Sequence, residues 1–132
     1  DKINPSLLII GDLSFYHDMN GLLAAKNKMN ITIVVINNSG GGIFSFLPLS
    51  QIRKDLYDSF WNTDTNIEIK MVANIYSCKF YRSTNLSSLR KNIEKCMQHK
   101  GVKIIEVVTN IRKNLDSHNK LYSKIKKIVK TI

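Results

Sequence analysis

Three stretches of the chain, residues 7–10, 31–36 and 102–108, are short and dominated by aliphatic side chains. Runs of this length, without strict alternation of apolar and polar positions, are typical of strands that helices cover on both faces of a parallel sheet. Residues 79–82 form a shorter candidate strand. We therefore predict a sheet that is mainly parallel.

Apolar positions recur at helical spacing between these strands. We predict helices over residues 18–27, 50–60 with Ser50 as N-cap, 67–76, 86–98 and 116–129. Because strands and helices alternate, the predicted fold class is α/β, an open sheet with helices on both faces. Ligands of such sheets bind beyond the carboxyl ends of the strands.

The first strand leads into a segment, residues 11–16, that we predict to be a loop. Gly11 permits a tight turn, and Asp12 leaves the strand end next to the start of a helix. Asp and Ser are common helix N-caps, so capping by Asp12 or Ser14 is a sufficient explanation of this loop taken alone.

The second strand leads into residues 37–42, which are two asparagines, a serine and three consecutive glycines. A flexible connection is the simplest explanation of such a loop. Three adjacent glycines nevertheless lose much conformational entropy on folding, and they are used where backbone must approach a ligand closely.

Together the two loops predict a metal site. Neighbouring strand ends would present the carboxylate of Asp12, the amide oxygen of Asn38 and bare backbone to one crevice. Such oxygen ligands suit Mg²⁺, which often shares its sites with phosphates. A cation between Asp12 and a diphosphate would turn their repulsion into attraction. It would explain an acidic residue at a phosphate site in a chain that has no P-loop pattern.

A dinucleotide-binding loop is the alternative interpretation of the same glycines. Gly40, Gly42 and Ser45 stand at the spacings of a G-x-G-x-x-G loop that follows a strand. Ser45 replaces the glycine that close packing of helix on strand requires, and the apolar residues around it do not resemble a helix N-terminus. The pattern therefore argues against this function.

Length and composition are those of one globular domain. The chain has 132 residues, of which 43% are hydrophobic, and it begins at Asp1, inside what we expect to be a longer protein. No apolar stretch is long enough to span a bilayer, and no signal peptide pattern is present, which predicts a cytoplasmic location. Cys78 and Cys96 are predicted to be packed thiols.

The formal net charge of +10 raises the question of nucleic-acid binding. Much of the excess lies within residues 116–129, where lysines alternate with apolar residues at helical spacing. A solvated face of an amphipathic helix explains this pattern, and a contact with an acidic partner or with nucleic acid is the alternative.

The Gly11-Asp12 pair, followed about 25 residues later by Asn37-Asn38, resembles the diphosphate-binding motif of thiamine-diphosphate enzymes. Leu13 stands where most of that superfamily has glycine. The longer segments 11–15, 17–22 and 35–48 closely resemble one branch, the 2-succinyl-5-enolpyruvyl-6-hydroxy-3-cyclohexene-1-carboxylate synthases of menaquinone biosynthesis. The resemblance is dense over the first 48 residues or so and weaker beyond.

This resemblance implies a function for each motif residue. It makes residues 1–132 the C-terminal part of a diphosphate-binding domain, truncated before its first strand. The implied metal ligands for Mg²⁺, or Mn²⁺ in its place, are Asp12, Asn38 and Gly40. The implied cofactor-binding residues are Gly11, Asp12, Leu13, Ser14, Asn38, Gly40, Gly41, Gly42 and Ile43, and the residues expected to line the reacting centre are Ile43, Phe44 and Leu47.

The implied reaction is decarboxylation of 2-oxoglutarate and addition of the remaining four-carbon unit to isochorismate. The family's catalytic glutamate belongs to an N-terminal pyrimidine-binding domain, so we expect the isolated chain to be inactive and the enzyme to be a homodimer or homotetramer. Glu68, Glu94 and Glu106 are interpreted as helix-surface or strand-end residues. Another thiamine-diphosphate-dependent decarboxylase or carboligase, or a non-catalytic module that binds anions or nucleic acid, remains an alternative.

Overall fold

The computed structural model describes residues 4–25, 29–48, 54–61 and 63–130. The chain divides into two compact units. The first unit combines Asp1–Gly40 with Asp64–Thr109, and the second combines Gly41–Thr63 with Asn110–Ile132. No helix in the described ranges is long and apolar enough to cross a membrane.

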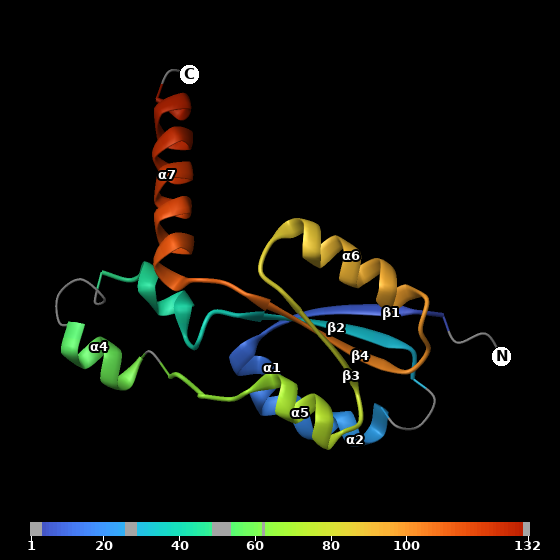
Figure 1. Ribbon diagram of the computed structural model, residues 1–132. Coiled ribbons are helices and arrows are strands. Elements are labelled where there is room, and N and C mark those ends of the chain that lie inside the picture. The colour runs from blue at the N-terminus through green and yellow to red at the C-terminus, as the bar shows by residue number, and fades with distance from the viewer. Residues whose placement is uncertain (1–3, 26–28, 49–53, 62, 131–132) are drawn as a thin grey trace. The chain divides into compact units, whose positions relative to one another are not determined.

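The first unit is built on a four-stranded sheet in which all neighbours are parallel (Figure 1). Its order is β1-β2-β4-β3. The strands are β1 (Ser6–Gly11), β2 (Ile31–Asn37), β3 (Lys79–Ser83) and β4 (Val102–Val108). This confirms the predicted open parallel sheet.

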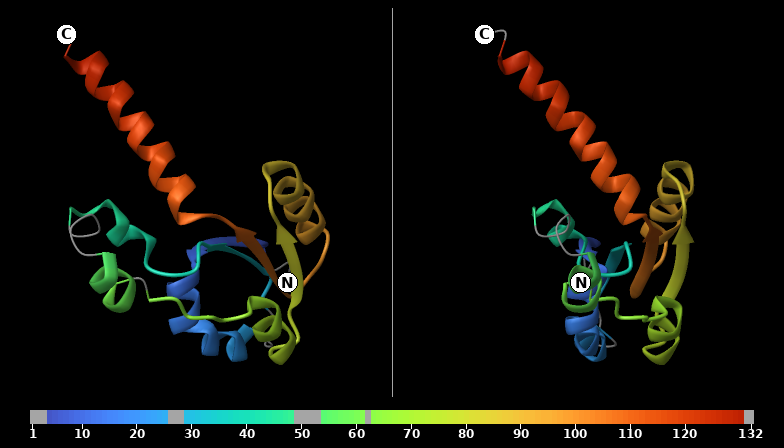
Figure 2. Two further views of the ribbon diagram at one scale, coloured as in Figure 1. Left: turned by 60° about the vertical axis from the view of Figure 1, so that its left-hand side comes forward. Right: turned by 90° about the vertical axis from the view of Figure 1, so that its left-hand side faces the viewer.

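Helices cover both faces of this sheet, and each face has its own core (Figure 1). On one face, α1 (Asp12–Asp18), α2 (Leu22–Ala25) and α5 (Ile69–Ile75) each contribute buried apolar side chains to a core shared with β2 and β4. On the other, α6 (Leu86–Met97) packs on Val34 and Ile105. Figure 2 shows β3 between α5, which precedes it, and α6, which follows it; the two helices pack on opposite faces of the sheet.

Alternation along the central strands explains why they are continuously apolar. In β2, Ile33 and Val35 belong to the first core, whereas Val34 belongs to the second. Both sides of such a strand need apolar side chains, which removes the usual alternation with polar residues. The edge strand β1 is different, because Leu7 is 52% and Ile9 is 65% exposed.

Two expectations for the first unit are wrong. Residues 11–16 do not form a loop, because α1 begins at Asp12 and buries Phe15 to 3% exposure. Residues 18–27 do not form one helix. A 3-10 turn, η1 (Met19–Gly21), separates α1 from the single turn of α2, with Gly21 at the junction. Residues 26–27 of the predicted helix lie outside the described residues.

Local capping and buried polar contacts fix the rest of the unit. Asn85 caps α6 with a capping box, in which its side chain accepts from the Ser88 amide. Lys103 is 1% exposed on β4, and its ammonium group donates to Asn30 Oδ1 at 2.6 Å and to the His99 carbonyl at 3.0 Å. Neither cysteine forms a disulfide; Cys96 is fully buried, as predicted for a packed thiol, whereas Cys78 is half-buried.

The second unit contains η2 (Gly42–Phe46), α4 (Lys54–Phe60) and α7 (Ile111–Val129). The last helix begins five residues before the predicted start at residue 116, because the side chain of Asn110 caps it by accepting from the Lys113 amide at 3.0 Å. Phe46 of η2 packs edge-on against His118 of α7. The predicted N-cap Ser50 lies outside the described residues.

Candidate metal and diphosphate site

The ends of β1 and β2 lie side by side, because Gly11 is in register with Ile36. Asp12 follows the first of these strand ends as the first residue of α1, and residues 37–40 follow the second. The side chain of Asp12 is therefore enclosed between two segments that are distant in sequence. It is only 8% exposed, which is unusual for a carboxylate.

Backbone amides hold both oxygens of the Asp12 carboxylate. Oδ1 accepts from the Leu13 amide and Oδ2 accepts from the Gly40 amide, each at 2.9 Å. Asp12 is not the N-cap of α1, a position that Gly11 occupies without a side-chain hydrogen bond. The bond to Gly40 connects the start of α1 to the segment that follows β2, so the carboxylate does not act as the predicted helix cap.

The amide group of Asn38 completes a cluster of oxygen-bearing groups. One of its terminal atoms lies 2.8 Å from the Gly40 carbonyl oxygen and 3.2 and 3.3 Å from the two Asp12 carboxylate oxygens. With its nitrogen in this position, the amide donates to all three oxygens. With its oxygen there, four oxygen atoms from three residues face one another, an arrangement that a bound cation would stabilise.

Backbone conformation in the loop brings these groups together. Ser39 has a φ of 64° and Gly40 has a φ of 124°, both in the left-handed region. A serine rarely adopts this conformation unless its surroundings stabilise it, and here the Asn37 side-chain oxygen accepts from the Ser39 amide at 3.1 Å. Gly40 is buried, and its φ explains why glycine stands there.

A buried glutamate that sequence reasoning did not assign to the site lies next to this loop. Glu106 of β4 is 3% exposed, and its carboxylate binds Asn37 of β2 and Arg82 of β3. Its sequence signal is a charged residue inside a run of aliphatic side chains. Glu106 lies inside β4, two residues before its last residue, and is buried rather than exposed at a strand end.

The other predicted cofactor residues fall into two groups. Leu13 and Ser14 continue α1 beyond Asp12, the leucine half-buried and the serine exposed. The apolar residues and the last two glycines belong to the second unit, where Ile43 is 74% and Leu47 is 47% exposed. Within that unit the Phe44 ring lies 5.5 Å from the ring of Trp61.

Gly41 of the second unit is closely confined by its neighbours. A Cβ atom at this position would lie 2.7 Å from the Trp61 carbonyl oxygen and 3.2 Å from the Phe44 ring. At Gly41 the close approach is to the protein's own backbone, and the approach of these glycines to a ligand stays a prediction.

No group of three His, Cys, Asp or Glu side chains that could hold a metal ion occurs in the described ranges. A metal bound at the Asp12 cluster would therefore rely on one carboxylate together with neutral amide and carbonyl oxygens. That donor set excludes a thiolate or imidazole zinc site at this place and suits a hard cation.

Comparison with known proteins shows the class to which the chain belongs. Residues 2–107 match the model of the thiamine pyrophosphate enzyme family, C-terminal TPP binding domain, and the chain is a member of that family. It is also similar to curated 2-succinyl-5-enolpyruvyl-6-hydroxy-3-cyclohexene-1-carboxylate synthases, which confirms the resemblance noted in the sequence.

Two of these synthases illustrate the extent of the similarity. The protein of Listeria innocua serovar 6a is 46% identical over 129 residues, which are 97% of this chain and 22% of the relative. That of Staphylococcus epidermidis is 42% identical over 125 residues, 93% of this chain and 22% of the relative. The chain thus spans about a fifth of the length of these relatives.

Solved structures support the fold. Benzoylformate decarboxylase from Polynucleobacter necessarius aligns with a TM-score of 0.69 at 19% identity, covering 83% of this chain and 20% of that one. A structure from Mycobacterium smegmatis, described as that of a thiamin diphosphate-dependent enzyme, aligns with a TM-score of 0.62 at 19% identity. The alignment covers 81% of this chain and 18% of that one. At this identity the alignments establish the architecture alone.

Proposed function

We propose that this chain holds the diphosphate of thiamine diphosphate through a Mg²⁺ ion bound by Asp12, Asn38 and the Gly40 carbonyl. The observation that carries the proposal is the spacing of these groups, from 2.8 to 3.3 Å between the Asn38 amide and its neighbours. Adjacent ligands of octahedral Mg²⁺, with bonds of about 2.0–2.1 Å, lie about 2.9 Å apart.

The charge of Asp12 supports the same proposal. The carboxylate is buried, and among the described residues no basic side chain forms an ion pair with it. Backbone amides stabilise a buried carboxylate only in part, whereas a divalent cation compensates it fully. Mn²⁺, which accepts similar oxygen ligands, could occupy the site in place of Mg²⁺.

The remaining contacts to the cofactor are assigned to the residues around this cluster. Gly11, Leu13 and Ser14 would lie beside the diphosphate at the start of α1, and Gly41, Gly42 and Ile43 continue the chain directly from Gly40. The apolar Ile43, Phe44 and Leu47 would line the reacting centre and exclude water from it.

For the complete protein we propose a thiamine-diphosphate-dependent transferase of menaquinone biosynthesis, on the basis of 42–46% identity to the curated synthases. Bound thiamine diphosphate supplies the carbanion chemistry by which 2-oxoglutarate loses CO₂ and the remaining unit adds to isochorismate. The residues of this chain bind the metal, orient the diphosphate and provide apolar walls. The acid–base glutamate would come from an N-terminal pyrimidine-binding domain, in a cytoplasmic homodimer or homotetramer.

Calorimetric titration of thiamine diphosphate into the full-length protein tests this proposal, first with Mg²⁺ and then with a chelator. Asn38→Ala and Asp12→Asn should each abolish the metal-dependent heat, because each removes a metal ligand or its charge. Asn20→Ala is the matched control, since it removes a side chain that accepts from Tyr76 Oη at 2.7 Å elsewhere in the same unit. It should bind like the wild type.

Two results would contradict the proposal. Binding that is unchanged by the chelator and by Asp12→Asn would exclude a metal-mediated diphosphate site. Salt-sensitive binding of nucleic acid that is indifferent to Asp12, in a protein without affinity for thiamine diphosphate, would instead support the binding-module alternative.

A further inference from the structure

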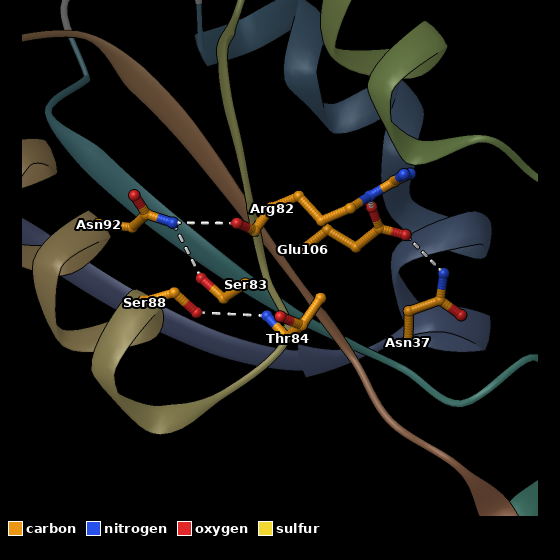
Figure 3. A network of polar contacts seen from close by, with 7 residues as sticks. All are labelled: Asn37, Arg82, Ser83, Thr84, Ser88, Asn92 and Glu106. Carbon is orange, nitrogen blue, oxygen red and sulfur yellow. Dashed lines mark hydrogen bonds and ion pairs between the residues drawn. The ribbon is translucent and has the colours of Figure 1, made fainter.

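A polar network centred on the buried Glu106 links the end regions of three strands next to the candidate metal site (Figure 3). At its centre, the Glu106 carboxylate accepts from Asn37 Nδ2 at 2.7 Å through Oε1 and from Arg82 Nε at 2.6 Å through Oε2. Arg82 is directly in register with Glu106 on the neighbouring strand. The three side chains come from β2, β3 and β4, at the end of the sheet where ligands bind.

The charge of Glu106 is compensated within this network. Its side chain is 4% exposed, whereas that of Arg82 is 50% exposed, so the arginine reaches from solvent to the buried carboxylate. Hydrogen bonds to ionised groups are the strong ones, and removal of one partner leaves the other buried without compensation. The hydrogen bond from the Asn37 amide to Glu106 is therefore stronger than one to a neutral acceptor would be.

This contact fixes which way the Asn37 amide faces. Because Nδ2 is bound to Glu106, Oδ1 is the atom available to accept from the Ser39 amide at 3.1 Å. That bond stabilises the left-handed conformation of Ser39, which turns the chain so that the Gly40 amide reaches Asp12 at 2.9 Å. The backbone carbonyl of Asn37 is held as well, by the Thr109 amide at 2.8 Å.

The other side of the network anchors Arg82. Asn92 of α6 donates to the Arg82 carbonyl at 3.2 Å and to Ser83 Oγ at 2.9 Å, and Ser88 Oγ accepts from the Thr84 amide at 3.3 Å (Figure 3). Ser83 is fully buried. These contacts fix the end of β3 to α6, so the ion pair with Glu106 rests on a rigid support.

We propose that Glu106 is a positioning residue for the metal site, acting through Asn37 to set the turn that presents Asn38 and the Gly40 carbonyl. The inference rests on the proposed function for the identity of the ligand. Groups that orient metal ligands are worth about 10- to 100-fold in metal affinity when they are removed. Glu106 does not contact the metal ligands themselves, and the effect is transmitted by the Asn37 amide.

The test is a Mg²⁺ titration of thiamine diphosphate binding in the full-length protein. Glu106→Ala should raise the Mg²⁺ concentration for half-maximal binding by roughly 10-fold or more. Glu106→Gln keeps an oxygen that can accept from Asn37, and it should retain most of the Mg²⁺ affinity that Glu106→Ala loses. Lys103→Met is the matched control, because Lys103 is also a buried charged residue of β4 that contacts an asparagine, at the opposite end of the strand. It should change the Mg²⁺ requirement less than twofold.

A double-mutant cycle separates positioning from a general loss of stability. If Glu106 acts through Asn37, then Glu106→Ala should add less than twofold to the Mg²⁺ requirement in an Asn37→Ala background. Full additivity of the two substitutions would refute transmission through the asparagine.

Hydrogen exchange of the ligand-free protein gives a readout that does not depend on the cofactor. The Gly40 amide, protected by Asp12, should exchange faster in Glu106→Ala, or in Asn37→Ala if that variant does not fold, and should be unchanged in Lys103→Met. Equal exchange in all variants, or wild-type Mg²⁺ affinity in Glu106→Ala or Asn37→Ala, overturns the inference. A wild type that binds no cofactor, yet shows the expected exchange, would overturn the proposed function alone.

Discussion

Gly41→Ala is the substitution whose cost follows most directly from the structure. The new methyl group would lie 2.7 Å from the Trp61 carbonyl oxygen, where ordinary van der Waals contact begins at 3.4 Å. Trp61 contributes a backbone atom at this contact, and the chain must therefore move by several tenths of an ångström. The Phe44 ring, at 3.2 Å from the same methyl group, limits movement in the other direction.

The expected loss is about 1–3 kcal/mol of unfolding free energy, the usual cost of forcing extra carbon into a packed place. A decreased entropy of the unfolded chain offsets about 0.4–1 kcal/mol of it, because alanine has fewer accessible conformations than glycine. For a domain of this size each kcal/mol corresponds to roughly 4 °C in Tm. Gly21→Ala is the control, since a Cβ there meets nothing within 4 Å.

Trp61 provides the assay, because it is the single tryptophan of these 132 residues and packs on Phe44 in the same unit. Thermal unfolding followed by its fluorescence should show a lower Tm for Gly41→Ala and an equal or higher Tm for Gly21→Ala. A Gly41→Ala protein as stable as the wild type would show that the 2.7 Å approach is absent in solution.

Further predictions concern capping and titration. Asn85→Ala should cost about 1 kcal/mol in a urea titration, because the α6 capping box is lost, whereas Ser87→Ala on the exposed side of that helix should not. Burial raises the pKa of the Cys96 thiol above 9.0, so the unfolded chain loses this proton first and stability falls as pH rises past 9.0. Cys96→Ala should remove that fall in urea titrations between pH 8 and 10. Burial lowers the pKa of Lys103 below 10.5, so the folded protein loses this proton before the unfolded chain does, and the free energy of unfolding rises as pH approaches 10.5. Lys103→Met should remove this rise. An unchanged pH slope would contradict the assignment.

The strands of the first unit could be predicted from the sequence because each central strand is buried on both faces. A run such as residues 31–36 has no other common explanation in a chain of this kind, and the parallel order follows from alternation with helices. The start of α1 could not be predicted in the same way. Phe15 is the one apolar side chain of α1 that is buried, and a single buried position does not produce a periodic pattern in the sequence.

For the candidate site, the sequence indicated the residues and the structure added their geometry. Asp12, Asn38 and Gly40 could be grouped because neighbouring strand ends share one edge of the sheet. Glu106 could not, because its function depends on cross-strand register with Arg82 and on a contact with Asn37 that lies 69 residues away in sequence. Pairings of this kind are decided by the fold as a whole.

The exposed edge of β1 has a practical consequence for anyone who prepares these residues alone. Leu7 and Ile9 present apolar side chains on a strand whose outer backbone groups have no neighbouring strand within the described sheet. Such an edge is a template for pairing with a second chain, which favours aggregation at the concentrations that calorimetry and exchange experiments need. Biochemical work is therefore best done on the full-length protein, or with a lysine at position 9 to keep the edge soluble.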